Sequence, residues 1–273
     1  MDYTLNCNGR LLSLETPQVM GILNATPDSF FADSRQQTEE GIARRTHQIL
    51  DEGGSIIDVG ACSTRPDSQP VSEDEEMERL RFALPIVRRE APHAIISVDT
   101  FRPVVARIAV EEYGADIIND VGNHTSQFSV LRSPFDMFRM VSRLRVPYIY
   151  MSHKSTVKEV MLDCAEAVAA LRSMGQKDII LDPGFGFGKT LEENYALMQQ
   201  LERMQTLQLP LLVGISRKSM IWKLLQTTPD GALNGTTVLN TIALMKGADI
   251  LRVHDVRQAV ETVKILSSLT SNP

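Results

Sequence analysis

Short apolar stretches recur along the chain at intervals of roughly 20–40 residues, the spacing that repeated strand–helix units require. They are rich in β-branched and aliphatic residues and are too short for helices, so they predict strands. Eight such stretches follow one another: Val19–Leu23, Ser55–Val59, Ala94–Val98, Asp116–Ile118, Tyr148–Met151, Ile179–Leu181, Leu211–Val213 and Ile250–Val253.

The segments between these stretches are rich in Glu, Arg, Ala and Leu, which predicts helices. The clearest are Glu39–Glu52, Glu73–Glu90, Pro103–Tyr113, Val157–Arg172, Glu193–Met204, Thr237–Lys246 and Val256–Leu269. Ser72 and Glu75 form a capping-box pattern, and Pro103 suits the first turn of its helix. Gly114 and Gly247 stand where the C-terminus of a helix favours a left-handed residue.

The first residues have a different pattern. Two alternating stretches, Tyr3–Cys7 and Arg10–Leu14, flank the pair Asn8-Gly9, which predicts a β-hairpin. The remaining strand–helix repeats continue without a linker or a change in composition. We therefore predict an α/β fold, a single (β/α)8 TIM-barrel domain over residues 1–273, with the short N-terminal β-hairpin closing one end. The alternative is an open doubly wound sheet, which is disfavoured because no dinucleotide-binding glycine motif follows the first strand.

Composition narrows the class of protein further. The chain has 273 residues, 43% hydrophobic and 23% charged, which fits a folded globular protein and excludes a disordered or fibrous one. The apolar runs are too short to span a bilayer, so we expect no membrane partner. A net charge of −6 argues against binding to nucleic acid. Three scattered cysteines and no visible secretory signal predict a reducing, cytoplasmic location.

Polar residues directly follow seven of the eight predicted strands: Asn24, Ser63–Pro66, Asp99-Thr100, Asn119-Asp120, Asp182–Gly184, Ser216–Ser219 and Arg252–His254. One such residue alone is better explained as a turn or a helix cap. In a parallel barrel, however, the ends of all strands meet on one face, which is where active sites lie. The repetition therefore predicts a shared site.

Two kinds of chemistry are represented at these strand ends. Three residues can accept hydrogen bonds from a ring with several N–H donors: Asp99, Asn119 and Asp182. Four residues form a cationic set suited to phosphate: Arg65, Lys218, Arg252 and His254. Arg252 and His254 are two positions apart, so on a strand they face the same side.

Two other features have a plainer explanation. The run Gly184–Thr190 resembles a phosphate-binding loop, but Pro183 occupies the position of the first glycine in the Walker pattern. We predict a tight loop with Phe187 as a pocket wall, rather than an ATP site. Cys62 is a single cysteine with no resolving partner nearby, so we interpret it as a small filler rather than a redox thiol.

Seven segments, taken together, carry a specific resemblance. They are MGILNATPDSF (20–30), IIDVGACSTRP (56–66), SVDTF (97–101), ADIINDV (115–121), LDPGFGFGKT (181–190), LLVGISRKSMI (211–221) and GADILRVHDV (247–256). In this order they resemble the dihydropteroate synthase family of pterin-binding barrels. That family joins 6-hydroxymethyl-7,8-dihydropterin pyrophosphate to 4-aminobenzoate and releases pyrophosphate, forming 7,8-dihydropteroate in folate synthesis. The resemblance implies a Mg²⁺-dependent transferase, a homodimer and a target of sulfonamides.

The resemblance also implies roles for individual residues. The pterin would be held by Asp99, Asn119, Asp182 and Lys218. The pyrophosphate would be held by Thr64, Arg65, Arg252 and His254. The 4-aminobenzoate site would be lined by Pro66, Phe187, Ser219 and Phe30. Asn24 would be the protein's ligand to Mg²⁺, and the catalytic set would be Lys218, Arg252 and His254.

The sequence departs from the family pattern at a few positions. Cys62 replaces the usual large polar residue, Asp67 replaces the glycine after the STRP motif, and Met151–Lys154 replaces a Met-His-Met motif. Two alternative functions therefore stay open: a methyltransferase of the same barrel family that carries methyl-tetrahydrofolate, or a pterin-binding protein without catalysis. A methyltransferase has no need of the phosphate-binding cations, which favours the synthase.

Overall fold

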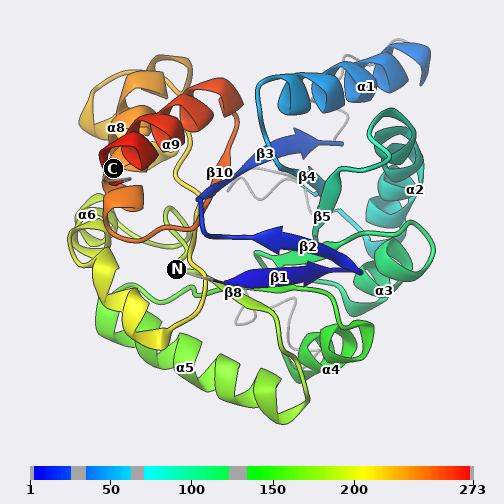
Figure 1. Cartoon of the computed structure of the whole chain (residues 1–273), viewed down its shortest axis with the longest axis horizontal. Coiled ribbons are helices and arrows are strands. Elements are labelled where there is room, and N and C mark those ends of the chain that lie inside the picture. The colour runs from blue at the N-terminus through cyan, green and yellow to red at the C-terminus, as the bar shows by residue number, and fades with distance from the viewer. Residues whose placement is uncertain (1–2, 26–34, 63–70, 123–133, 271–273) are drawn as a thin grey trace.

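The computed structural model describes residues 3–25, 35–62, 71–122 and 134–270. Its centre is a ring of eight parallel strands surrounded by helices (Figure 1). The strands are β3 (Gln18–Asn24), β4 (Ile56–Gly60), β5 (Ile95–Asp99), β6 (Ile117–Asp120), β7 (Tyr148–Met151), β8 (Ile179–Asp182), β9 (Leu212–Val213) and β10 (Ile250–Val253). They pair in the order β8-β7-β6-β5-β4-β3-β10-β9, and a bridge between Leu181 and Leu211 joins the two ends. The predicted (β/α)8 TIM barrel is confirmed.

The helices form the outer layer of the barrel (Figure 1). They are α1 (Arg35–Asp51), α2 (Glu73–Glu90), α3 (Pro103–Glu111), α4 (Pro134–Leu144), α5 (Val157–Ser173), α6 (Leu191–Gln199), α7 (Ser219–Leu224), α8 (Leu233–Met245) and α9 (Val256–Thr270). Ser72 accepts a hydrogen bond from the Glu75 N–H, and Gly114 and Gly247 have φ of 65° and 93°, so these boundaries are confirmed.

Besides the six-residue helix α7, which the composition does not predict, two longer helical segments differ from the prediction. The predicted helix Glu193–Met204 is divided into α6 and a 3₁₀ helix, Leu201–Leu207. In a 3₁₀ helix residues three apart lie on one side, and Leu201 and Met204 are the two that this one buries. Helix α4 was absent from the prediction because its sequence contains no Glu or Ala. It is held by the apolar spacing of Met137, Phe138 and Val141, all of which are buried.

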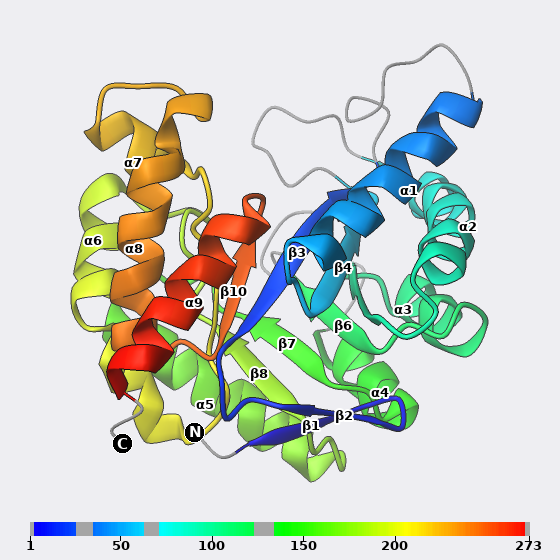
Figure 2. The ribbon, with the colours of Figure 1, turned by 45° about the horizontal axis from the view of Figure 1, so that its top comes forward.

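The barrel interior is apolar at its N-terminal end. Each strand contributes one residue to this layer: Met20, Ile56, Ile95, Ile117, Ile149, Ile180, Leu212 and Ile250. The predicted hairpin, β1 (Thr4–Cys7) and β2 (Arg10–Ser13), lies across the same end (Figure 2). Asn8 and Gly9 both have positive φ, 52° and 89°, as a two-residue hairpin turn requires. Leu5, Cys7, Leu12 and Leu14 pack on the apolar layer, so the hairpin closes the barrel from below.

We expect Leu5→Ala to destabilise the protein by about 2–5 kcal/mol because Leu5 is fully buried and its removal leaves a cavity under the barrel. The free energy of unfolding in urea measures this. Leu11 is the matched control, since it belongs to the same hairpin but is 76% exposed. Leu11→Ala should change the free energy by no more than about 0.5 kcal/mol. Equal effects of the two variants would show that the hairpin does not support the core.

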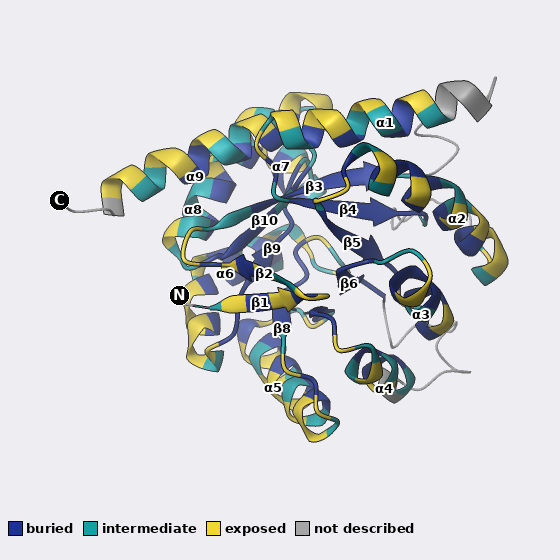
Figure 3. Cartoon of the chain, turned by 45° about the vertical axis from the view of Figure 1, so that its right-hand side comes forward, coloured by how far each residue is buried: buried dark blue, intermediate teal, exposed yellow. Residues whose placement is uncertain are grey.

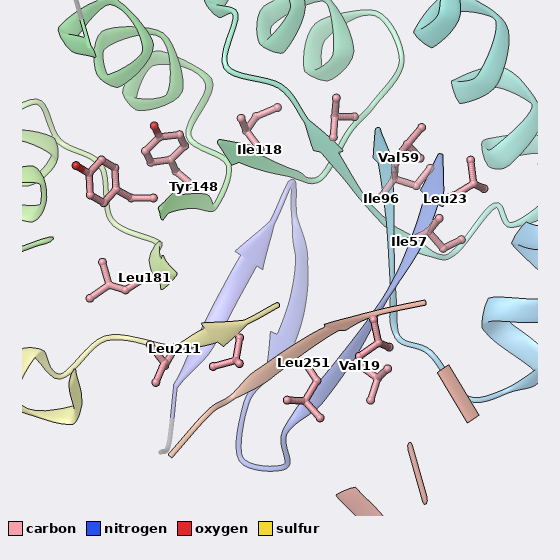
Figure 4. Close-up of a cluster of buried hydrophobic side chains, with 14 of the residues drawn as sticks. Val19, Leu23, Ile57, Val59, Ile96, Ile118, Tyr148, Leu181, Leu211 and Leu251 are labelled. Carbon is pink, nitrogen blue, oxygen red and sulfur yellow. The ribbon is translucent and has the colours of Figure 1, made fainter. Parts of the chain in front are cut away.

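The outward faces of the strands are apolar as well. Val19, Ile57, Ile96, Ile118 and Leu251 point from the strands towards the surrounding helices (Figure 4). The helices are buried on the side that covers the strands and exposed on the other (Figure 3). Strands buried on both faces explain the continuous apolar runs in the sequence.

Polar residues occupy the barrel interior only towards the C-terminal ends of the strands. Side chains on a strand alternate, so residues two positions beyond the apolar layer face the interior again. These positions hold Asp58 after Ile56, Asn119 after Ile117, Asp182 after Ile180 and Arg252 after Ile250, and in β5 Ser97 and Asp99 follow Ile95. The fold thus places the predicted site at the C-terminal end. None of the helices in the described residues is long and apolar enough to cross a membrane.

Candidate active site

The predicted acceptors meet at one end of the barrel, as expected. Asp99 and Asn119 are partners in the register of β5 and β6, and Asp182 ends β8. All three are buried, with exposures of 8%, 0% and 4%. Buried carboxylates and amides require hydrogen-bond partners, so this end of the barrel is built to receive donors.

Arg252 lies between two carboxylates. Its Nε atom donates to Asp58 Oδ2 at 2.6 Å, and its Nη2 atom donates to Asp99 Oδ2 at 2.8 Å. The charges of Asp58 and Asp99 raise the pKa of Arg252 above its ordinary value and outweigh the effect of burial. The cation predicted from the strand end is therefore present, but its charge is already compensated inside the protein.

Asp58 is a site residue that the strand-end pattern does not predict. This residue is fully buried and binds three other polar side chains of the barrel: Ser97 Oγ at 2.6 Å, Asn119 Nδ2 at 3.1 Å and Arg252 Nε. The signal was a charged residue in the middle of an otherwise apolar strand, IIDVG. A charge at such a position is costly unless it is paired, so it indicates a polar network.

Burial perturbs the two acceptor carboxylates. Burial raises the pKa of Asp99, although the ion pair with Arg252 opposes the shift and Asp58 adds to it. Burial also raises the pKa of Asp182, opposed by Lys218 and by the Gly184 N–H, which donates to Asp182 Oδ1 at 2.7 Å. Both carboxyl groups are shielded from solvent, so a ligand that supplies N–H donors stabilises their charged forms.

Lys218 lies beside the loop that follows β8. Its ammonium group donates to the carbonyl of Phe185 and lies 4.4 Å from the ring centroid of Phe187. Burial lowers the pKa of Lys218 to about 7, and Asp182 opposes the shift. Gly186 permits this contact, because a Cβ there would lie 2.8 Å from Lys218 Cδ. Lys218 and Phe187 thus lie side by side at the C-terminal end of the barrel.

The other side of Phe187 meets the segment that departs from the family pattern. The ring of His153 packs edge-on against Phe187 at 5.8 Å between centroids, and His153 Nε2 lies 2.8 Å from the carbonyl oxygen of Gly122. Ser152 turns towards α5, where its hydroxyl donates to Asp163 at 2.6 Å. The departure therefore supports the position of the predicted aromatic wall.

The glycine-rich run after β8 forms a tight loop. Gly184 has φ of 72°, and a Cβ there would lie 2.1 Å from the Ser152 carbonyl oxygen, so only glycine fits. Lys189 donates to the Gly184 carbonyl at 2.7 Å, and Thr190 caps α6. The two residues that resembled a phosphate-binding motif thus hold the loop and the helix.

His254 is beside Arg252 but is neutral. Its Nδ1 atom lies 3.2 Å from Ser216 Oγ. Burial, with the charge of Arg252, lowers the pKa of His254 to about 4. The imidazole is therefore uncharged at neutral pH, whereas the sequence analysis counted it among the cations.

The lowered pKa of His254 has a measurable consequence for stability. The folded state holds a proton on His254 only below about pH 4, whereas the unfolded chain binds one below 6.5. The contribution of His254 to the free energy of unfolding is therefore complete above pH 6.5 and is lost as the pH falls towards 4. We expect His254→Gln to flatten the pH dependence of the free energy of unfolding between pH 6.5 and 4. An unchanged slope would show that His254 is not neutral in the folded protein.

Arg217, in the SRKS motif, is directed away from the acceptors. It has φ of 55° and donates to both carboxylate oxygens of Asp255 at 2.8 Å. Next to it, Lys218 occupies the N-cap position of α7, a six-residue helix that begins at Ser219. Arg217 therefore stabilises the fold, whereas its neighbour Lys218 belongs to the site.

Five predicted site residues remain, and one of them, Asn24, lies in the described part of the chain. Phe30, Thr64, Arg65 and Pro66 lie outside the described residues. Asn24 ends β3 and is half-buried, and a Cβ on Gly60 would lie 3.8 Å from Asn24 Oδ1. Within the described ranges, no group of three or more His, Cys, Asp or Glu side chains could hold a metal ion.

The surroundings of Cys62 agree with its interpretation as a small filler rather than a redox thiol. Burial raises the pKa of its thiol to about 12, with the charge of Glu76 adding to the shift. The sulfur lies 3.7 Å from Arg102 Nη1. A thiol that stays protonated at neutral pH is a poor nucleophile.

The fold and the site define a (β/α)8-barrel enzyme in which buried acceptors, a lysine and an arginine meet at the C-terminal end of the strands. The model of a family described as pterin binding enzyme matches residues 20–254. The chain belongs to this family.

Individual relatives agree with this assignment. The chain is 36% identical to the dihydropteroate synthase of Escherichia coli (strain K12) over 276 residues, covering 98% of this chain and 96% of the relative. The solved dihydropteroate synthase of Xanthomonas albilineans with 4-aminobenzoic acid is 35% identical, with a TM-score of 0.88 over the full length of both chains. The structure of the Xanthomonas albilineans enzyme in complex with 7,8-dihydropteroate is 34% identical, with a TM-score of 0.85, and covers 99% of this chain and 100% of that one.

Proposed function

We propose that this protein is a dihydropteroate synthase, a transferase of folate biosynthesis. It joins 6-hydroxymethyl-7,8-dihydropterin pyrophosphate to 4-aminobenzoate and releases pyrophosphate. The observation that carries the proposal is the set of buried acceptors, Asp99, Asn119 and Asp182, next to Lys218 and Arg252. A flat ring with several N–H donors satisfies acceptors of this kind. The near full-length similarity to dihydropteroate synthases supports the same substrates.

The chemistry requires no protein nucleophile. Once pyrophosphate begins to leave, the dihydropterin ring delocalises positive charge at the methylene carbon, and the amine of 4-aminobenzoate attacks there. The protein then works by orientation and electrostatics. Asp182 accepts the two adjacent N–H groups of the pterin edge, and Asp99 and Asn119 accept others. Lys218 contacts both the ring and the second substrate, whose site is completed by Phe187, Ser219, Phe30 and Pro66.

The leaving group is held by the cationic side of the site. Nε and Nη2 of Arg252 are bound to carboxylates, which leaves its Nη1 atom for the anion within the described part of the site. Neutral His254 contributes hydrogen bonds rather than charge, and Thr64 and Arg65 complete this set. Asn24 fits Mg²⁺, because its amide oxygen is a hard ligand at the strand end and this ion is bound by few protein groups together with substrate phosphates. When bound there, Mg²⁺ would supply charge stabilisation to the departing pyrophosphate.

We expect metal chelation to abolish turnover and added Mg²⁺ to restore it. Asn24→Ala should lower kcat/KM by about 10²-fold, because it removes the protein's ligand to the ion without disturbing the acceptors for the pterin. Calorimetry with Mg²⁺ and inorganic pyrophosphate tests the same role without turnover, and the variant should bind the pair more weakly than the wild type. Full activity in excess chelator would contradict this assignment.

A single assay tests the function. Pyrophosphate release is followed with both substrates and with each alone. A dihydropteroate synthase releases it only when 4-aminobenzoate is present and forms dihydropteroate in equal amount. A methyltransferase would instead consume methyl-tetrahydrofolate, and a non-catalytic pterin-binding protein would bind pterin without release. Either outcome would overturn the proposal.

Three broader properties belong to the same proposal. We propose that the 273 residues form one domain, that the protein acts in the cytoplasm, and that it is a homodimer. The dimer is supported by exposed apolar side chains on the contacting helices α8 and α9, where Val238, Met245, Ile265 and Leu269 are 50–76% exposed. Exposed apolar side chains in such a group mark a contact surface. Sedimentation velocity should give a mass near twice that of one chain, and a monomer would contradict the proposal.

A further inference from the structure

Among the described residues, the side-chain amide of Asn119 has a hydrogen-bond partner at one end and none at the other. Its Nδ2 group donates to Asp58 Oδ2 at 3.1 Å. Its Oδ1 atom is buried and has no hydrogen-bond partner among the described residues. A buried acceptor left in this way destabilises the empty site, and a ligand that supplies the missing donor removes that cost.

The orientation of this amide follows from the chemistry of its partner. Asp58 forms an ion pair with the Arg252 guanidinium, and a carboxylate in such a pair only accepts hydrogen bonds. The end of Asn119 that faces Asp58 must therefore be the NH₂ group. The opposite end is then an oxygen, which suits a pterin N–H and repels a ring acceptor.

The carboxylate of Asp58 is itself held in one orientation by its hydrogen bonds. Its Oδ2 atom also receives Arg252 Nε at 2.6 Å, and its Oδ1 atom receives Ser97 Oγ at 2.6 Å. With Asn119 these make three hydrogen bonds from three different strands, β5, β6 and β10, to one carboxylate on β4. A fully buried group with that many partners has a single orientation.

We propose that Asp58 is a positioning residue that fixes Asn119 as a hydrogen-bond acceptor towards the pterin ring. The inference deepens the proposed function and rests on it. Asp58 does not touch the substrate, because its oxygens are used by Ser97, Asn119 and Arg252. It acts through the direction in which Asn119 presents its amide.

Two substitutions separate this role from a structural one. Asp58→Leu removes the acceptor and releases the Asn119 amide. Asp58→Asn keeps an oxygen towards Asn119 and Arg252, while its NH₂ group can donate to Ser97, whose hydroxyl can turn to accept. We expect Asp58→Leu to weaken binding of 6-hydroxymethylpterin by about 10- to 100-fold, and Asp58→Asn by no more than about threefold. The KM for 4-aminobenzoate should be unchanged in both.

A double-mutant cycle tests whether Asp58 acts on pterin binding through Asn119. Asn119→Ala should lose pterin affinity by itself, and adding Asp58→Leu to it should weaken binding by no more than about threefold, since the group that Asp58 orients is already gone. Ser97→Ala is the matched control. It removes one hydrogen bond from Asp58 but leaves Asn119 and Arg252 in place, so pterin affinity should hold while the melting temperature falls.

Pterin binding is measured by calorimetry on the full chain, with the melting temperature recorded for every variant. If Asp58→Leu does not fold, Asp58→Ala repeats the test without added bulk. The inference is overturned if Asp58→Leu binds pterin like the wild type, or if folded Asp58→Asn loses as much affinity as Asp58→Leu. Pterin binding by the wild type without pyrophosphate release would overturn the proposed function alone, because the Asp58 test reads binding.

Discussion

Asp182→Asn is expected to weaken binding of the pterin substrate by about 10- to 100-fold. The asparagine keeps one oxygen for the Gly184 N–H, which donates to Asp182 Oδ1 at 2.7 Å. Its NH₂ group then replaces the second oxygen and meets a ring N–H, so two donors face each other in a buried site. The bidentate pairing of a carboxylate with two adjacent N–H groups is lost at the same time.

Calorimetry with 6-hydroxymethylpterin measures the affinity, and steady-state kinetics should show the loss in kcat/KM. Asp178→Asn is a matched control, because Asp178 precedes the same strand at the opposite end of the barrel and accepts from the Asn6 N–H at 3.2 Å. This control should bind pterin normally. Normal pterin affinity in Asp182→Asn would place the ring elsewhere in the barrel.

Lys218→Met is expected to lower kcat/KM by about 10²–10³-fold while making the folded protein more stable at pH 7. The loss of activity follows from the position of the ammonium group, which lies 4.4 Å from the ring centroid of Phe187 and interacts with the charge of Asp182. The gain in stability follows from its burial, which lowers the pKa of Lys218 to about 7. A methionine of similar length fills the space without a buried charge.

The sign of the stability effect can be worked out from the pKa. The unfolded chain holds a proton on this lysine up to pH 10.5, whereas the folded protein releases it above about 7. Between these values the unfolded state binds more protons, so wild-type stability rises with pH. Below about pH 7 both states are protonated and the cost of burial is complete. Lys218→Met should therefore exceed the wild type most below pH 7, and the difference should shrink as the pH rises towards 10.5.

Urea unfolding at several pH values, together with the coupled pyrophosphate assay, measures both effects. Lys177→Met serves as a control, since Lys177 is exposed at the other end of the barrel. It should leave turnover and the pH dependence unchanged. A Lys218→Met protein that keeps its activity, or that is less stable than the wild type below pH 7, would contradict the role assigned to this residue. Opposed effects on stability and activity are typical of a site that keeps a costly group for function.

Most of the barrel was predictable from local pattern. The apolar runs that mark β3 to β10 are continuous because the strands are buried on both faces, and the hairpin turn needs Asn8-Gly9 for its two positive φ angles. The strand-end rule then placed Asp99, Asn119, Asp182 and Lys218 on one face. Helix α4 is not predicted, because the prediction rests on composition and this helix is held by its apolar spacing.

The sequence by itself therefore determined which residues form strands and which polar groups gather at one end. It left undetermined how those groups pair. Asp58 and Arg252 are 194 positions apart, and they meet only because β10 and β4 both flank β3 in the closed ring. Neighbouring Arg217 and Lys218 look alike in sequence, but the left-handed backbone of Arg217 directs it to Asp255. Hydrogen bonds and charges depend on distance in space, and only the closing of the barrel sets those distances.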